Sequence, residues 1–82
     1  MFWVYVLKSK KDGKQYTGFT VDLDRRLAEH NAGRTESTRR RRPFEVIYSE
    51  AYEEREQAKK RERFLKSGQG RKELKRILEG TR

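Results

Sequence analysis

The chain has 82 residues and a formal net charge of +9, so we expect a single domain over residues 1–82 with a small core and a basic surface. The absence of cysteine excludes disulfides and thiolate metal sites, and we expect a cytoplasmic protein. The apolar N-terminal segment is too short to cross a membrane and lacks the layout of a signal peptide. Charge of this sign and size predicts a polyanionic partner, most often a nucleic acid and less often an anionic membrane, and we expect no membrane partner here.

The first part of the chain predicts a β-hairpin. Residues 2–8 are aromatic and β-branched, and residues 15–20 alternate in character as strands do. The pair Asp12-Gly13 between them favours a tight turn. We therefore expect these two segments to pair as neighbouring strands.

A short helix should follow the hairpin. Asp22 has the character of an N-cap, and Asn31 and Gly33 are typical of a helix end. The positions that should face inward recur at helical spacing: Leu23, Leu27 and His30 or Asn31.

The second half of the chain predicts one more strand and two helices. Residues 34–42 are polar and basic and should form a solvated loop, and residues 44–52 resemble a strand. Residues 53–66 and 71–80 have helical apolar spacing, with a glycine-containing break between them. The order β-β-α-β-α-α predicts an α+β fold in which helices flank a small, mainly antiparallel three-stranded sheet.

Two tyrosines and a glycine on the predicted hairpin have both a structural and a functional interpretation. Tyr5 and Tyr16 should lie on neighbouring strands, where such pairs usually pack, although their hydroxyls could also serve chemistry. Gly18 could permit a bend or let a ligand approach the backbone. Taken singly, packing is the commoner explanation for the tyrosines.

The first predicted helix carries a basic cluster. Arg26 and His30 are four residues apart and so share a helix face, next to Arg25. A solvated basic face and a histidine that satisfies its own hydrogen bonds are the simpler explanations. An arginine at the border of the apolar face could instead point into a groove.

The second predicted helix carries one misplaced carboxylate. Glu62 lies between Ala58 and Leu65 on the apolar face, where its charge is costly unless it is paired or binds a metal. Pairing with Arg61 or Arg63 and metal binding are about equally supported by the pattern.

Two basic segments are candidates for phosphate contacts. Residues 39–42 are four consecutive arginines, for which the charge of the chain favours phosphate contact over a solvated, disordered segment. Residues 66–71 resemble a phosphate-binding glycine loop, but a helix–helix turn that ends at Gly68 is better supported. Backbone N–H groups at the start of the last helix could still hold one phosphate. The candidate nucleic-acid contacts are Gly18, Arg25, Arg39, Arg40, Arg41, Arg42, Lys66 and Arg71.

Together these residues resemble the GIY-YIG nuclease superfamily, in particular its small stand-alone bacterial members. The triplets Trp3-Val4-Tyr5 and Tyr16-Thr17-Gly18 stand where that family has its two name-giving triplets. Three further positions match the family's catalytic arginine, its histidine or tyrosine, and its metal-binding glutamate: Arg26, His30 and Glu62. The ordered set is far more specific than either triplet alone.

The resemblance implies a metal-dependent endonuclease that hydrolyses phosphodiester bonds in DNA, including structured or branched DNA. It implies that Glu62 holds one Mg²⁺ or Mn²⁺ ion and that Arg26 stabilises charge on the phosphate. A hydroxyl of Tyr5 or Tyr16 would orient or deprotonate the attacking water, and His30 would accept or relay the proton. We therefore expect nucleic acid as the partner, DNA rather than RNA.

Two other functions are compatible with the same charge. A module of the same fold could bind DNA or RNA without cutting it, and a ribosome-associated accessory protein would also be basic. The complete set of candidate catalytic residues favours the nuclease, because a binding module has no need of Glu62 on an apolar face.

Overall fold

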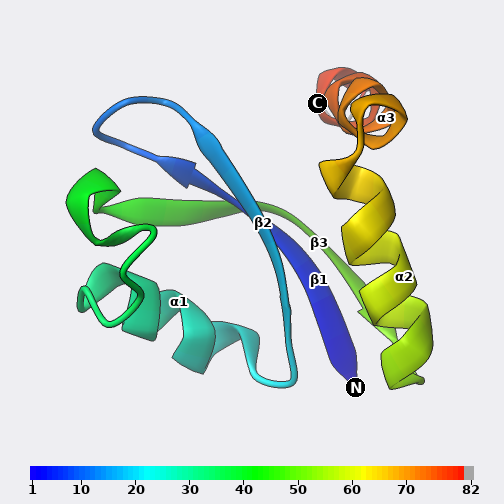
Figure 1. Cartoon of the computed structure of the whole chain (residues 1–82), viewed down its shortest axis with the longest axis horizontal. Coiled ribbons are helices and arrows are strands. Elements are labelled where there is room, and N and C mark those ends of the chain that lie inside the picture. Colours follow the sequence, from blue (N-terminus) through cyan, green and yellow to red (C-terminus); the bar gives the residue numbers. More distant parts are fainter. Residues whose placement is uncertain (81–82) are drawn as a thin grey trace.

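The computed structural model describes residues 1–80, which form a three-stranded sheet with helices on both faces (Figure 1). Strand β1 lies between β2 and β3 and pairs antiparallel with both, so the predicted α+β fold and the order β-β-α-β-α-α are confirmed. No helix within these residues has the length and apolar character needed to cross a bilayer. The elements in chain order are β1 (Phe2–Ser9), β2 (Gln15–Thr20), α1 (Leu23–Asn31), the 3-10 helix η1 (Arg39–Arg41), β3 (Phe44–Tyr52), α2 (Arg55–Lys66) and α3 (Gly68–Gly80).

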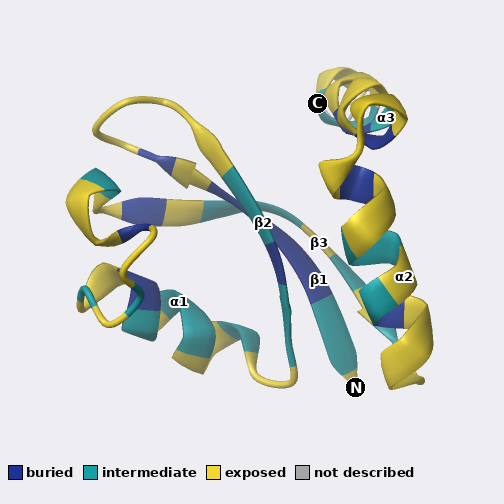
Figure 2. Cartoon of the chain, viewed as in Figure 1, coloured by how far each residue is buried: buried dark blue, intermediate teal, exposed yellow. Residues whose placement is uncertain are grey.

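The central strand divides the core into two layers. Successive side chains of a strand point to opposite faces, so Val4 and Val6 face α2 and α3 while Tyr5 and Leu7 face α1. Figure 2 shows this burial along β1, in contrast to the largely exposed outer surfaces of the helices. The helices complete the first layer with Ala58, Leu65 and Leu74.

A β-bulge in β3 adjusts which side chains reach each layer. Val6 pairs with Tyr48 and Leu7 with Val46, so Ile47 is an extra residue on β3. As a result both Ile47 and Tyr48 pack against the α2–α3 layer, while Val46 packs against the α1 layer.

The local signals at the first turn and helix were predicted correctly. Gly13 has a φ of +75°, and Gly33, just after α1, has a φ of +80°, which only glycine adopts easily. The Asp22 carboxylate accepts a hydrogen bond of 3.1 Å from the Arg25 N–H, as an N-cap should.

The polar, basic loop predicted over residues 34–42 includes η1 and is packed against the rest of the chain. The Thr38 side chain is completely buried, and the Ser9 hydroxyl, also buried, donates to the Arg41 carbonyl. The Arg41 guanidinium pairs with Asp12 at 3.2 Å. These contacts attach the segment to the β1–β2 turn, and polar composition alone could not reveal them.

The junction between α2 and α3 also differs from expectation. The predicted helix–helix turn is present, and Gly68 directly follows Ser67, the C-cap of α2. However, Gly68 has no positive φ and already begins α3, which was expected to start at residue 71. The Ser67 hydroxyl accepts the Gly70 N–H at 3.1 Å, so this N–H is not available to a phosphate. A Cβ on Gly70 would lie 1.7 Å from the Phe64 carbonyl oxygen, so glycine is what lets α3 start against the end of α2.

Replacing Gly70 with alanine should therefore destabilise the domain. The added Cβ must push α3 away from the α2 backbone, and overpacking of this kind costs about 3 kcal/mol. Urea denaturation followed by circular dichroism measures the loss. Gly68→Ala is the matched control, because its Cβ would have no neighbour within 4 Å, and its stability should stay within about 1 kcal/mol of the wild type. Equal stability of the two variants would contradict this account of the junction.

Candidate active site

Tyr5 fits on the sheet because the residue opposite it on β2 is a glycine, Gly18, which has no side chain. The register places Tyr5 opposite Gly18, with Tyr16 as a diagonal neighbour and ring centroids 6.4 Å apart. A Cβ on Gly18 would lie 2.5 Å from the Tyr5 hydroxyl oxygen. Gly18 is buried, and its role in this structure is to make room for Tyr5 rather than to bend the strand or expose its backbone.

His30 completes an aromatic cluster with the two tyrosines. Helix α1 turns it inward, where it is completely buried, with its ring 5.0 Å from Tyr16 and 6.1 Å from Tyr5. Its Nε2 lies 3.2 Å from the Tyr5 hydroxyl and its Nδ1 lies 2.8 Å from the Thr38 hydroxyl. The hydrogen bonds of His30 are thus satisfied, and one of them joins two of the predicted site residues.

Thr38 is a member of this cluster that the sequence did not predict. It precedes η1, is 0% exposed, and donates to the Thr35 carbonyl at 3.4 Å in addition to its contact with His30. The surrounding sequence is polar and without periodicity, so nothing local distinguishes Thr38 from the neighbouring Thr35 and Ser37. Only the path of the chain around the end of α1 reveals it.

Asn31 does more than end the helix. Its side-chain amide accepts the Phe44 N–H at 2.7 Å and donates to the Phe44 carbonyl at 3.2 Å, as the backbone of a neighbouring strand would. These two bonds fasten the last turn of α1 to the first residue of β3. The backbone that carries His30 is therefore held at a fixed distance from the sheet.

Arg26 lies next to the Tyr5 hydroxyl, whereas Arg25 does not. The partly buried Arg26 guanidinium bonds Glu29 at 3.0 Å. Burial raises the pKa of Tyr5 above its usual value near 10, and the neighbouring Arg26 acts in the opposite direction. Arg25 is exposed and lies 3.6 Å from Glu29 on the outer side of the helix. Glu29, which the sequence did not single out, thus helps to orient Arg26.

Glu62 approaches the cluster from α2. Its side chain is 20% exposed and pairs with Lys66 at 3.1 Å. The alternative that it pairs with Arg61 or Arg63 is therefore wrong. Its negative charge contributes to raising the pKa of Tyr5, after burial and the Tyr16 ring, so it lies within electrostatic range of the cluster.

Arg61 belongs to a separate polar network on the α2–α3 side of the sheet. It bonds the Glu50 carboxylate through two nitrogens, at 3.0 and 3.1 Å, and Glu50 also accepts from the Tyr48 and Tyr52 hydroxyls. A third guanidinium nitrogen reaches Glu73 at 3.4 Å. This network explains why Arg61 is not free to neutralise Glu62.

A groove at the edge of β2 connects the tyrosine cluster to the α2–α3 junction. This β2 groove has a volume of about 380 Å³. Two of the predicted phosphate-binding residues lie in it with Tyr16. Its lining consists of Gln15, Tyr16, Thr17, Leu65, Lys66, Arg71 and Leu74.

The arginine run lies elsewhere. Arg40 and Arg41 contact the β1–β2 turn through Lys11 and Asp12, and the Arg41 guanidinium also sits 5.7 Å from the centre of the Phe44 ring. Arg41 is therefore a structural residue, while Arg39, Arg40 and Arg42 are exposed.

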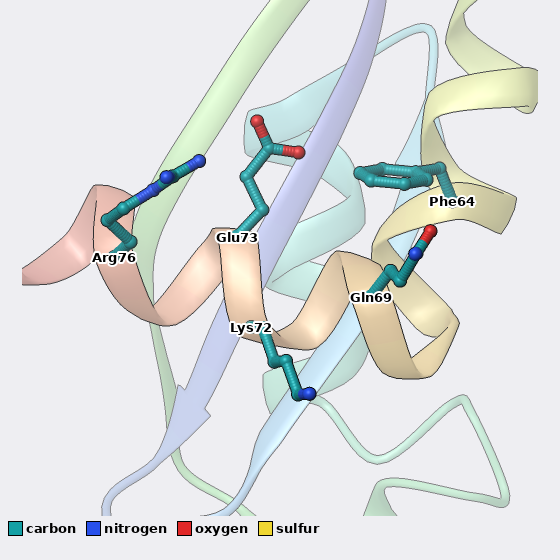
Figure 3. Close-up of a pocket in the computed structure, with 5 residues that line it drawn as sticks. All are labelled: Phe64, Gln69, Lys72, Glu73 and Arg76. Carbon is teal, nitrogen blue, oxygen red and sulfur yellow. The ribbon is translucent and has the colours of Figure 1, made fainter.

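Another hollow, of about 470 Å³ between α2 and α3, contains none of the predicted site residues (Figure 3). It is lined by Phe64, Gln69, Lys72, Glu73 and Arg76.

The donor set around Glu62 restricts which cation it could hold. Within residues 1–80 no three histidine or carboxylate side chains are grouped as a metal cage would require. One carboxylate suits Mg²⁺ or Mn²⁺, because such ions keep several waters and take substrate phosphate oxygens as further ligands. The Lys66 ammonium, 3.1 Å from the carboxylate, shows that this position already attracts a cation. The residues present thus fit a divalent ion held jointly with a substrate.

His30 should titrate below its usual pKa of 6.5, because burial and then the positive charge of Arg26 lower its pKa, while Glu29 opposes them. The unfolded chain then binds the proton at higher pH than the folded chain. The free energy of unfolding should therefore fall as the pH drops from about 6.5 toward the folded-state pKa. NMR titration of this histidine, the only one in the chain, gives its pKa, and urea denaturation across the same pH range gives the stability. A pKa at or above 6.5 would show this expectation to be wrong.

Comparison with known proteins agrees with this geometry. Residues 1–75 match the model of the GIY-YIG catalytic domain. UPF0213 proteins from Staphylococcus saprophyticus and Staphylococcus epidermidis are 38% and 39% identical to the chain over 79 residues, which is 95% of each protein. The solution NMR structure of a UPF0213 protein from Bacillus halodurans is 35% identical, with a TM-score of 0.59 over 99% of this chain and 89% of that one. The chain therefore belongs to the GIY-YIG family of nucleases, among the small UPF0213 proteins.

Proposed function

We propose that this protein is a divalent-metal-dependent endonuclease that hydrolyses phosphodiester bonds in DNA, including branched or structured DNA. The main support is the Tyr5–His30 hydrogen bond of 3.2 Å, beside Arg26, in a cluster that reaches a basic groove through Tyr16. A protein that only bound nucleic acid would need the groove. It would not need a buried phenol–imidazole pair, which is costly to bury and gives no binding surface.

The two tyrosines would have different roles. Tyr5 is 1% exposed, whereas Tyr16 is partly exposed and lines the β2 groove, so Tyr16 is the hydroxyl that can meet the attacking water. A protonated phenol can take the proton of the water only if it passes on its own, so a further proton acceptor is needed. His30, kept neutral by burial, would supply that acceptor behind Tyr5.

The charged residues would act on the phosphate. Arg26, held by Glu29, would stabilise the negative charge that develops on the pentavalent phosphorus. A divalent cation bound by Glu62 would neutralise a phosphate oxygen and help the leaving group. Lys66 would then be released from Glu62 and become free to contact phosphates in the β2 groove.

Basic side chains extend the groove beyond the cluster. A neighbouring hollow of about 700 Å³ shares Gln15 and Arg71 with the β2 groove and adds Lys8 and Lys75 to its lining. Two carboxylates, Glu45 and Glu79, also line it. A phosphate backbone could follow this path from the cluster, with binding dominated by electrostatics.

Glu62→Gln tests the proposal, because it is nearly isosteric and removes one negative charge. It should abolish cleavage that depends on Mg²⁺ or Mn²⁺ and leave nucleic-acid binding intact or tighter. The assay compares branched, flapped, single-stranded and duplex DNA and RNA with Mg²⁺, Mn²⁺ or EDTA. Glu56→Gln, an exposed carboxylate on the same helix, is the matched control and should cut like the wild type.

Three outcomes distinguish the alternatives. Binding by the wild type without cleavage of any substrate would favour the non-catalytic module. Cleavage by Glu62→Gln at the wild-type rate would remove Glu62 as the metal ligand. Cleavage of RNA but not DNA would correct the substrate.

The exposed arginines should contribute to binding and Arg41 to folding. Replacing Arg39 and Arg40 together with alanine should weaken binding and reduce the slope of log K against log salt by about 0.9 for each duplex phosphate that is no longer neutralised. The stability of this double variant should be unchanged, whereas Arg41→Ala should lower the free energy of unfolding because it leaves Asp12 and Phe44 without their partner. Salt-dependent binding and urea denaturation measure both effects. An unchanged salt slope would mean that the exposed arginines do not touch phosphates.

A further inference from the structure

We infer that Thr38 is a positioning residue that fixes His30 in the tautomer protonated on Nδ1, so that the Tyr5 hydroxyl donates to His30 and its oxygen remains an acceptor toward Arg26. The tautomer is a property of the folded chain by itself. Only its consequence for cleavage rests on the proposed function.

The direction of these hydrogen bonds is set at the buried end of the series, where Thr38 contacts Thr35. A backbone carbonyl can only accept, so the Thr38 hydroxyl donates to the Thr35 carbonyl at 3.4 Å. With its single proton used there, the Thr38 oxygen accepts from His30 Nδ1–H at 2.8 Å. The Nε2 atom of His30 then carries a lone pair, which accepts the Tyr5 hydroxyl at 3.2 Å.

At the other end of this series of hydrogen bonds, the position of Arg26 requires the same direction. The Arg26 guanidinium beside the Tyr5 hydroxyl has only donors, so toward Arg26 the Tyr5 oxygen must accept. In the opposite tautomer Nε2–H would also donate to Tyr5, and the phenolic proton would need an acceptor elsewhere. Tyr5 is 1% exposed, so water does not readily provide one, and a buried donor without a partner is costly.

Burial makes this arrangement a strong constraint. His30 and Thr38 are both 0% exposed, so water cannot easily replace either hydrogen bond. Buried polar groups of this kind are almost always paired inside the protein. Loss of the Thr38 hydroxyl would leave Nδ1–H without an acceptor, and the proton would be better placed on Nε2, facing the Tyr5 oxygen.

The tautomer determines whether His30 Nε2 can accept a proton during the proposed hydrolysis. In the proposed reaction the attacking water loses its proton as it bonds to phosphorus. When a proton reaches the Tyr5 oxygen, the Tyr5 proton moves to His30 Nε2, while the other ring proton stays on Nδ1, hydrogen-bonded to Thr38. The proton is returned as the bond from phosphorus to the leaving oxygen breaks and that oxygen is protonated, which restores neutral His30. In the other tautomer Nε2 already carries a proton and cannot accept one.

The first experiment reads the tautomer without any substrate. The chain has a single histidine, so nitrogen-15 NMR of uniformly labelled protein near pH 7.5 assigns its two ring nitrogens without ambiguity. We expect Nδ1 protonated and Nε2 unprotonated in the wild type and in Thr38→Ser, and the reverse in Thr38→Val. Nε2–H in the wild type overturns the inference, and so does Nδ1–H in Thr38→Val. The wild-type spectrum decides even if Thr38→Val does not fold.

The second experiment measures the consequence for cleavage. Thr38→Val should lower kcat by on the order of 100-fold with little change in KM, because one proton-transfer partner is lost while the groove is intact. Thr38→Ser should recover most of the rate, and Ser37→Ala, at an exposed neighbouring hydroxyl, should cut like the wild type. A normal kcat in Thr38→Val overturns the positioning role. Absence of cleavage in the wild type itself would refute the proposed nuclease function but not the tautomer, which the spectra test separately.

Discussion

The hydrogen bond between Tyr5 and His30 is the contact on which the candidate site depends. It joins β1 to α1, and the bond from His30 to Thr38 extends the link to the segment before η1. All three segments must therefore be correctly placed for these contacts to form. Polar groups buried in this way destabilise a fold unless each is satisfied, and they then specify one arrangement. Gly18 allows the strand side of this contact, because any larger residue would occupy the space of the phenol.

The two faces of the sheet are covered by different kinds of core. The layer under α2 and α3 contains the aliphatic side chains of Val4, Val6, Leu65 and Leu74, packed as in an ordinary core. The layer under α1 contains the polar aromatic cluster instead, together with Leu7. The candidate site draws on both layers, because Tyr5 and Tyr16 lie under α1, which carries His30, while Glu62 comes from α2 and the groove is lined partly by Leu65 and Leu74.

Much of the fold follows from local rules in the sequence. Strand alternation, the Asp22 cap and the glycine at position 33 act within a few residues, so a linear pattern is enough to predict them. The family resemblance likewise supplied the site residues, because their order along the chain is distinctive. The partners of those residues were only partly predictable. Glu62 pairs with Lys66 at the i,i+4 spacing of a helix, whereas Arg61 bonds Glu50 on β3. Contacts of the second kind join elements distant in sequence, where no periodicity operates.

The bonds between the Asn31 amide and the Phe44 backbone give the domain a mechanical asymmetry. They resemble the pair of hydrogen bonds that one residue makes with a neighbouring strand. The last turn of α1 therefore cannot separate from β3 without breaking both bonds at once. The same movement would also uncover His30 and pull the buried Thr38 out of place, which makes this corner a single cooperative unit of local opening. The other side of the cluster lies at β2, the edge strand, which β1 separates from β3. His30 is thus held in place from the side of β3, whereas Tyr16 lies on the edge strand and lines the β2 groove.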